Sequence, residues 1–112
     1  MQAKLDREQS RAKQKETLTE LINNQNVDKS QKADCANSML EIQQRIEKET
    51  AAEALIEAKG FAEAYVRIDN NTVDVVVSKS VLSDAEIAQI EDIVKRKTGI
   101  DTANIRVAPL KK

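Results

Sequence analysis

The sequence predicts an α+β domain, a two-layer sandwich with the order helix-strand-strand-helix-strand and a three-stranded sheet, preceded by an N-terminal helical arm. Two observations carry this prediction. The spacing of apolar residues changes from a helical period to strict alternation after Gly60. Capping signals also bracket each predicted helix of the domain, at Asp28 and Gly60 for the first and at Ser83 and Gly99 for the second. A chain of 112 residues fits one such domain with an extra arm.

Residues 1–27 are predicted to form the solvated helical arm, and residues 28–112 the folded domain. The arm begins as a run of charged residues and glutamine, which offers too little apolar surface to dock firmly. A short apolar stripe follows, just before a polar turn, and we expect it to pack on the next helix. Its members are Leu18, Leu21 and Ile22.

The next helix is expected to continue from Asp28 to Lys59, where Gly60 supplies the left-handed residue that ends helices. Two apolar stripes run along it, offset from each other. We expect the first stripe to receive the arm and the second to cover the sheet. The first consists of Cys35, Met39, Ile42 and Ile46, and the second of Ala51, Ala54, Leu55 and Ala58.

Three strands are predicted, each with one apolar face. The inward residues are Ala62, Ala64, Val66 and Ile68 in the first strand, Val73, Val75 and Val77 in the second, and Ile105 and Val107 in the third. A hairpin at residues 69–71 joins the first two strands. The second and third strands are joined through a helix that begins after Ser83, and a right-handed crossover makes them parallel. We favour the order in which the first strand is central and antiparallel to both neighbours.

The composition argues against catalysis and against nucleic-acid binding. There are 18 basic and 19 acidic residues, so a basic surplus is missing, and there is no histidine. We therefore predict a non-enzymatic chain with no catalytic residues, no metal, no cofactor, no small-molecule substrate and no nucleic-acid partner. Carboxylate neighbours such as Glu47/Glu49 and Glu91-Asp92 fall on predicted exposed faces and are interpreted as solvated charge. The single cysteine, Cys35, is interpreted as a packed core thiol.

Three features favour a protein-binding role: unpaired edge strands, an open sheet face, and a long helix that can pack against a neighbour. On the open face, Tyr65 is an interface candidate, although an ordinary exposed aromatic residue is an equally good interpretation. The candidate contacts are Glu63, Tyr65, Arg67, Asp74, Val76 and Arg106, together with the backbone of residues 72–78 and 104–108.

The order of several short segments carries a family resemblance. These are A-K-G-F at 58–61, the valine-rich strand at 73–77, L-S-x-A-E-I-x-x-I at 82–90, and T-G-I-x-x-x-N-I at 98–105. Together with the long helix that begins at Asp28, they make residues 28–108 resemble the stage III sporulation protein AH family. None of these segments is a catalytic fingerprint, and the specificity lies in their succession.

The resemblance implies more than the residues do alone. It implies a mother-cell membrane protein with one N-terminal anchor and a soluble domain in the space between the mother-cell and forespore membranes. There the domain would bind the forespore protein stage II sporulation protein Q and contribute to a channel. The family's fold resembles the ring-building motif of type III secretion proteins, which implies self-association into a ring. The anchor is absent from this chain, so we expect a soluble fragment with residues 1–27 on the stalk side.

Other interpretations stay open from the residues. One is a generic small α+β adaptor. Another is an RNA-binding domain of the KH type, which has similar secondary structure but needs a GxxG loop that this sequence lacks. A third is an enzyme with an unrecognised carboxylate site.

Overall fold

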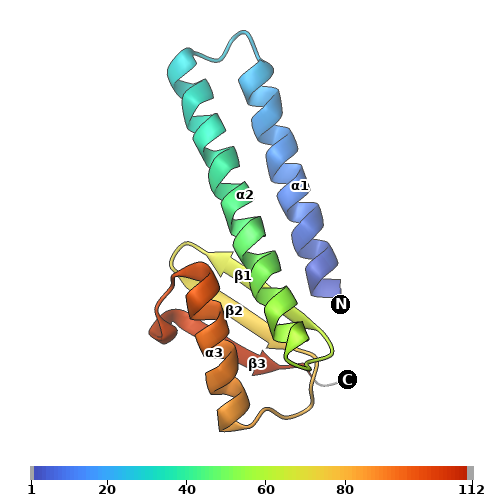
Figure 1. The fold of residues 1–112 in the computed structure, drawn as a ribbon. Helices are drawn as coiled ribbons and strands as arrows, with labels where there is room; N and C mark the ends of the chain where they lie inside the picture. Colours follow the sequence, from blue (N-terminus) through green and yellow to red (C-terminus); the bar gives the residue numbers. More distant parts are fainter. Residues whose placement is uncertain (1, 111–112) are drawn as a thin grey trace. The chain divides into compact units, whose positions relative to one another are not determined.

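The structure, a computed structural model, describes residues 2–110 (Figure 1). These residues fall into two compact units, residues 2–46 and the residues from 47 onward. The predicted fold class is confirmed, with helices, a three-stranded mixed sheet and an N-terminal helical arm. The elements are α1 (Gln2–Asn23), α2 (Lys29–Ala58), β1 (Ala64–Asp69), β2 (Thr72–Val77), α3 (Asp84–Thr98), a short 3₁₀ turn η1 (Thr102–Asn104) and β3 (Ile105–Pro109).

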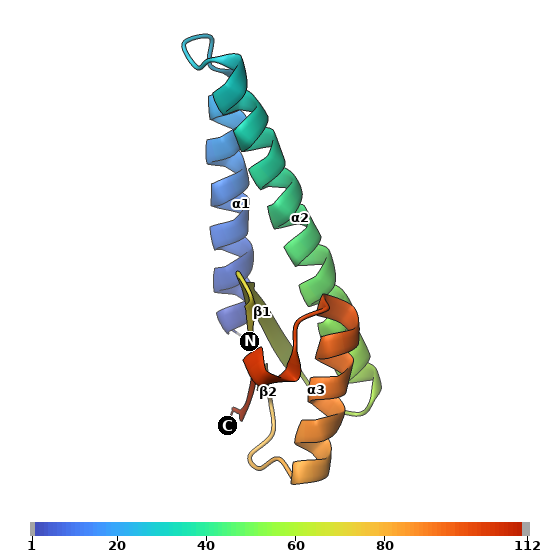
Figure 2. The ribbon, with the colours of Figure 1, turned by 90° about the vertical axis from the view of Figure 1, so that its left-hand side faces the viewer.

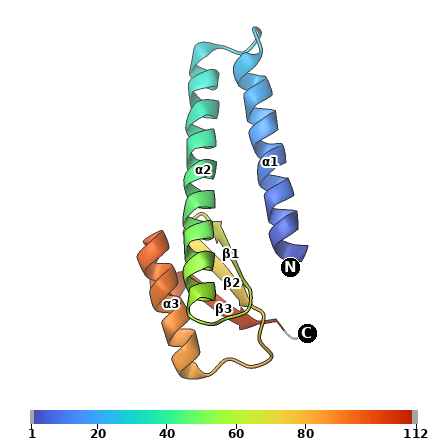
Figure 3. The same cartoon turned by 45° about the vertical axis from the view of Figure 1, so that its right-hand side comes forward.

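Residues 2–46 form a helical hairpin, in which α1 and the first part of α2 lie side by side (Figures 1, 2 and 3). Asp28 caps α2 as predicted, because its Oδ1 accepts the backbone N–H of Gln31 at 2.8 Å. Between the two helices, Lys15 donates to the Gln43 side chain at 2.6 Å. Of the apolar residues predicted to lie between the two helices, Leu21 is exposed and the other six are half-buried. The half-buried residues are Leu18, Ile22, Cys35, Met39, Ile42 and Ile46.

The sheet has the order β1-β2-β3, with β1 antiparallel to β2 and β2 parallel to β3. The parallel pairing of the second and third strands was predicted correctly. The prediction that the first strand is central was wrong, because the crossover through α3 returns to the position beside β2 without skipping a place. With three fully buried valines, β2 takes the position that is shielded on both sides.

One face of the sheet is covered by the last turns of α2 and by α3 (Figures 1 and 2). The apolar residues between these layers form a single cluster that contains almost no aromatic side chain. Its members are Ala52, Ile56, Phe61, Ala64, Val66, Ile68, Val73, Val75, Val77, Ile90, Ile93, Val94 and Ile105. The inward valines of β2 and the inward Ala64, Val66 and Ile68 of β1 are therefore confirmed.

The part of α2 that covers the sheet does so with a different face from the predicted one. Ala51, Ala54 and Ala58 are exposed and Leu55 is half-buried. The buried positions are instead Glu49, Ala52, Glu53 and Ile56. The prediction failed because two glutamates lie on the buried face, and an apolar pattern does not include them. Glu49, interpreted from the sequence as solvated charge, is fully buried.

The first strand begins at Ala64, three residues later than the predicted run from Phe61. Gly60 has a φ of 107°, and the chain bends again at residue 62 before the regular alternation of β1 begins. As a result Phe61 is buried in the core and Ala62 is exposed, the reverse of the prediction for Ala62. At the other end of β1, Asn70 has the positive φ that the hairpin prediction required.

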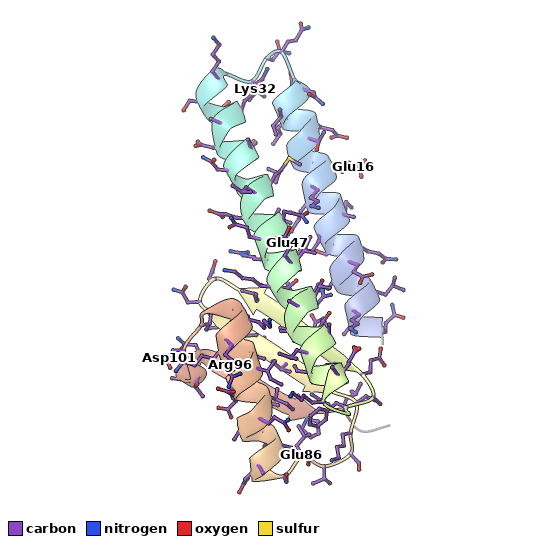
Figure 4. The ribbon with its side chains drawn as sticks, in the orientation of Figure 1. Glu16, Lys32, Glu47, Glu86, Arg96 and Asp101 are labelled. Carbon is purple, nitrogen blue, oxygen red and sulfur yellow. The ribbon has the colours of Figure 1, made fainter. Side chains whose placement is uncertain are left out.

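The third helix is capped at both ends as the sequence indicated. Ser83 and Glu86 form a reciprocal capping box, with bonds of 3.1 and 3.0 Å between each side chain and the other residue's backbone N–H. At the C-terminal end, Gly99 has a φ of 75° and donates to the Lys95 carbonyl. Glu86 also pairs with Lys79, and Figure 4 shows Glu86 and Arg96 near opposite ends of α3.

The Glu86 pairing predicts a pH dependence of stability. The hydrogen bond from Lys79 and the capping bond at Ser83 lower the pKa of Glu86 to about 2. The folded-state pKa lies below the pKa of about 4.3 expected for a glutamate in the unfolded chain. The contribution of Glu86 to the free energy of unfolding is therefore fully present above about pH 4.3 and is lost as the pH falls towards 2. Glu86→Gln should therefore lower the free energy of unfolding at neutral pH and have no effect near the lower limit. Urea titrations of both proteins across this range measure the difference, and a pH-independent difference would contradict the assignment.

Candidate protein–protein interface

The sheet face opposite the core gathers five of the six candidate side chains into two rows across the strands. In one row Tyr65 of β1 lies opposite Val76 of β2, which in turn lies opposite Ala108 of β3. In the other, Arg67 lies opposite Asp74, which in turn lies opposite Arg106. Side chains alternate along a strand and the intervening residues face the core, so these two rows share the outer face.

The second row is a charged stripe with a basic surplus. Asp74 lies between two arginines, and all three residues are exposed. The Nε of Arg67 also approaches Asp69 Oδ2 at 3.2 Å. The Asp69 carboxylate and a hydrogen bond with Tyr65 raise the pKa of Arg67 further above its ordinary value, so this guanidinium is charged at any physiological pH.

Three candidates differ in accessibility from what the sequence implied. Tyr65 is only 8% exposed, so its phenol ring is not an open anchor. Glu63 lies before β1, is half-buried, and holds the end of the sheet by accepting the Ser78 N–H through its carbonyl at 2.8 Å. The backbone of residues 72–78 was predicted to be available to a partner; this is wrong for β2, which is the central strand with neighbours on both sides.

The outer edge of β1 is occupied by side chains of α2. Glu53 Oε2 accepts the Val66 N–H at 2.7 Å, and Glu49 Oε2 accepts the Ile68 N–H at 2.8 Å. Both carboxylates are buried. An extended partner segment would need these same two donors to add a strand here. This edge is therefore closed in the structure.

The outer edge of β3 offers few donors. The Leu110 N–H bonds to Val77 of β2 at 2.8 Å, so by alternation the outward positions of β3 are residues 105, 107 and 109. The Ile105 N–H already donates to the Thr102 carbonyl. Pro109 has no N–H to offer. Among residues 105–109, Val107 is left as the outward donor.

Sequence reasoning missed Glu49 and Glu53, the two residues that most change the choice of interface. Their spacing places them on one helix face with Ala52 and Ile56, and this combined pattern was the available signal. It was overlooked because charged residues are rarely fully buried.

Residues 2–110 contain no group of three or more acidic or cysteine side chains placed to hold a metal ion. None of the helices in this range combines the length and apolar character that crossing a bilayer needs. A shallow hollow of about 340 Å³ lies beside the N-terminal end of α3 and is lined in part by Phe61, Ser78 and Lys79. Cys35 is a half-buried free thiol.

Comparisons with known proteins agree with this architecture. The family profile described as SpoIIIAH-like protein matches residues 1–107. No curated protein sequence matches the chain with significance. Among solved structures, a chain of the structure described as the SpoIIQ-SpoIIIAH pore forming complex is similar over 99% of this chain and 94% of its own, with a TM-score of 0.81 and 21% identity.

A second similar structure is the type III secretion system protein EscJ of enteropathogenic E. coli. It is similar over 67% of this chain and 51% of its own length, with a TM-score of 0.58 and 23% identity. At these identities the two likenesses establish the fold. They confirm the predicted relationship between this fold and that of a secretion-system protein.

Proposed function

We propose that this chain, which belongs to the SpoIIIAH-like protein family, is a non-enzymatic assembly module that binds stage II sporulation protein Q. The observation that carries the proposal is the family match over residues 1–107. The likeness to a chain of the SpoIIQ-SpoIIIAH complex supports it, because the whole described fold is shared. The complex would form in the space between the mother-cell and forespore membranes and contribute to a channel during endospore formation.

Protein Q is proposed to dock on the outer face of the sheet. The exposed groups there are Arg67, Asp74 and Arg106, with the half-buried Val76 beside them. Tyr65 and Glu63 would act chiefly by holding this face in shape, since both are partly or wholly covered. A face is favoured over an edge because the outward N–H groups at Val66 and Ile68 are already bonded. A partner surface with charged side chains of both signs would complement this row of alternating charges, in which Arg67 is already paired with Asp69.

The module is further proposed to self-associate into a ring when it is held at a membrane by an anchor outside this chain. Residues 1–27 would be the stalk and residues 28–112 the ring-forming domain. Each contact can be weak, since anchoring raises the effective concentration and a ring multiplies the contacts. The shared fold with EscJ, a secretion-system protein, supports this part of the proposal.

The test is binding of the soluble domain of protein Q to purified variants by titration calorimetry. We expect Arg67→Ala/Arg106→Ala to weaken binding about tenfold or more, because both side chains lie on the proposed face and are exposed. Arg96→Ala is the matched control, since Arg96 is also an exposed arginine paired with an acid but belongs to α3 on the opposite layer. Equal affinity of all three proteins would place the interface elsewhere, and a lack of binding by the unmodified chain would contradict the function itself.

A further inference from the structure

We propose that Glu49 and Glu53 act as a side-chain substitute for a fourth strand and keep the edge of β1 closed to pairing with a second copy of this chain. The inference goes beyond the proposed function and does not depend on protein Q. It rests on contacts within residues 47–110, which form one compact unit.

The two carboxylates take the places that two backbone carbonyls would take. In β1, the outward N–H groups belong to alternate residues, and the two that are bonded to α2 are those of Val66 and Ile68. The bonds are 2.7 and 2.8 Å long, at the short end of the range for N–H···O hydrogen bonds. A neighbouring strand would bond the same two donors.

The match depends on two spacings that agree. Glu49 and Glu53 are separated by four helical residues, a rise of about 6 Å. Val66 and Ile68 are separated by two strand residues, a rise of about 6.8 Å. Because Glu53 bonds the earlier strand residue and Glu49 the later one, α2 and β1 run in opposite directions here. A helix with acceptors at this interval can therefore follow a strand edge over two consecutive outward donors.

Burial indicates that these contacts are more than surface pairing. Glu49 is fully buried and Glu53 is 5% exposed. Carboxylates are seldom placed in such positions, because removing their charge from water is unfavourable unless hydrogen bonds compensate. Ala52 and Ile56 lie on the same helix face and belong to the core cluster. The apolar contacts of Ala52 and Ile56 hold the helix on the sheet. The helix in turn positions the two carboxylates to accept the outward N–H groups of β1.

Once the two carboxylates are removed, the partner best suited to pair with the outer edge of β1 is the β1 strand of a second copy of this chain. Antiparallel pairing of β1 with β1 of another molecule is symmetric, so the outward groups of both strands would be satisfied at once. The strand is well suited to pairing, with tyrosine, valine and isoleucine among its six residues. The opposite edge is a poorer template, because Ile105 and Pro109 offer no outward N–H.

The first test is the oligomeric state of Glu49→Ala/Glu53→Ala, measured by sedimentation velocity at micromolar concentration. We expect the unmodified chain to be monomeric and the alanine variant to form dimers. Glu49→Gln/Glu53→Gln should stay monomeric, because the amide oxygen still accepts a hydrogen bond from the strand. A folded alanine variant that remains monomeric would overturn the proposal. Should the double variant fail to fold, Glu53→Ala alone takes its place in the same comparison.

The second test needs no substitution. In the unmodified chain, amide hydrogen exchange at Val66 and Ile68 should be about ten- to a hundredfold slower than at Val107, the outward donor of the other edge. Comparable exchange at all three amides would show that the carboxylates do not close the edge, and the proposal would fail. Neither measurement involves protein Q, so failure here leaves the proposed function standing.

Discussion

Asp74→Pro is expected to destabilise the sheet unit of this protein strongly. The loss of one ladder hydrogen bond, with its carbonyl partner left unsatisfied, costs about 1 to 3 kcal/mol in the free energy of unfolding, and the clash of the proline ring with the ladder adds to this. Asp74 is paired with Arg67 on one side and with Arg106 on the other, so it lies in the middle of the central strand. Proline removes the N–H donor and is found in sheets essentially only on edges or at bulges. Circular dichroism during urea denaturation would measure the loss.

The matched control is Asp74→Asn, which keeps the backbone and removes only the charge. We expect it to change the free energy of unfolding by less than about 0.5 kcal/mol, as is usual at exposed positions. If the proline variant were as stable as the asparagine variant, β2 would not be central. The result also matters for binding experiments, because a proline at this position tests the fold and gives no information about docking.

Ile56→Ala is expected to lower the free energy of unfolding by about 2 to 5 kcal/mol. Ile56 is fully buried and links the last turns of α2 to the apolar cluster. The cluster contains no methionine, the flexible side chain best able to adapt to a gap, so the space left by the truncation is not readily refilled. The chain is small, and a loss of this size is a large fraction of the total stability of a typical domain.

Leu40→Ala is the control for this second substitution, since Leu40 belongs to the same helix but is 58% exposed. Its removal is expected to have an effect within about 0.5 kcal/mol. Equal losses for the two variants, measured by urea denaturation, would mean that the sheet-covering part of α2 contributes no core packing.

Local signals in the sequence were sufficient for most of the secondary structure. The capping box at Ser83, the cap at Asp28 and the glycine at residue 99 each depend on neighbouring backbone groups, and all three were predicted. The alternation of valines in β2 is equally local, because each side chain simply faces one side of its own strand. The predicted fold class followed from these elements.

The order of the strands and the buried face of α2 depend on contacts between distant segments. A right-handed crossover makes β3 parallel to β2 but does not determine whether another strand lies between them. The prediction therefore placed the first strand in the centre, where the structure has β2. The second error came from the hydrophobic pattern. The helical spacing of Glu49 and Glu53 with Ala52 and Ile56 was a signal for the buried face, but it does not show that β1 presents two N–H groups at a matching interval.

The geometry of the candidate face was predictable in part, while its role in binding stays a prediction. The predicted inward residues of the three strands imply that Arg67, Asp74 and Arg106 all face away from the core, and the register of the structure adds that they form a continuous row. The accessibility of Tyr65 was not predictable, since exposure depends on everything that packs around a side chain. The availability of backbone edges was also misjudged, because it is set by side chains from another element.

The scarcity of aromatic residues gives this molecule a built-in spectroscopic reporter. The chain has one tyrosine and no tryptophan, and both Phe61 and Tyr65 belong to the unit that contains the sheet. Near-ultraviolet signals and phenol fluorescence therefore follow that unit alone, while the helical hairpin of residues 2–46 contributes only to the far-ultraviolet spectrum. Recording both during one denaturation distinguishes a chain that melts in a single step from one whose hairpin frays first, without any label.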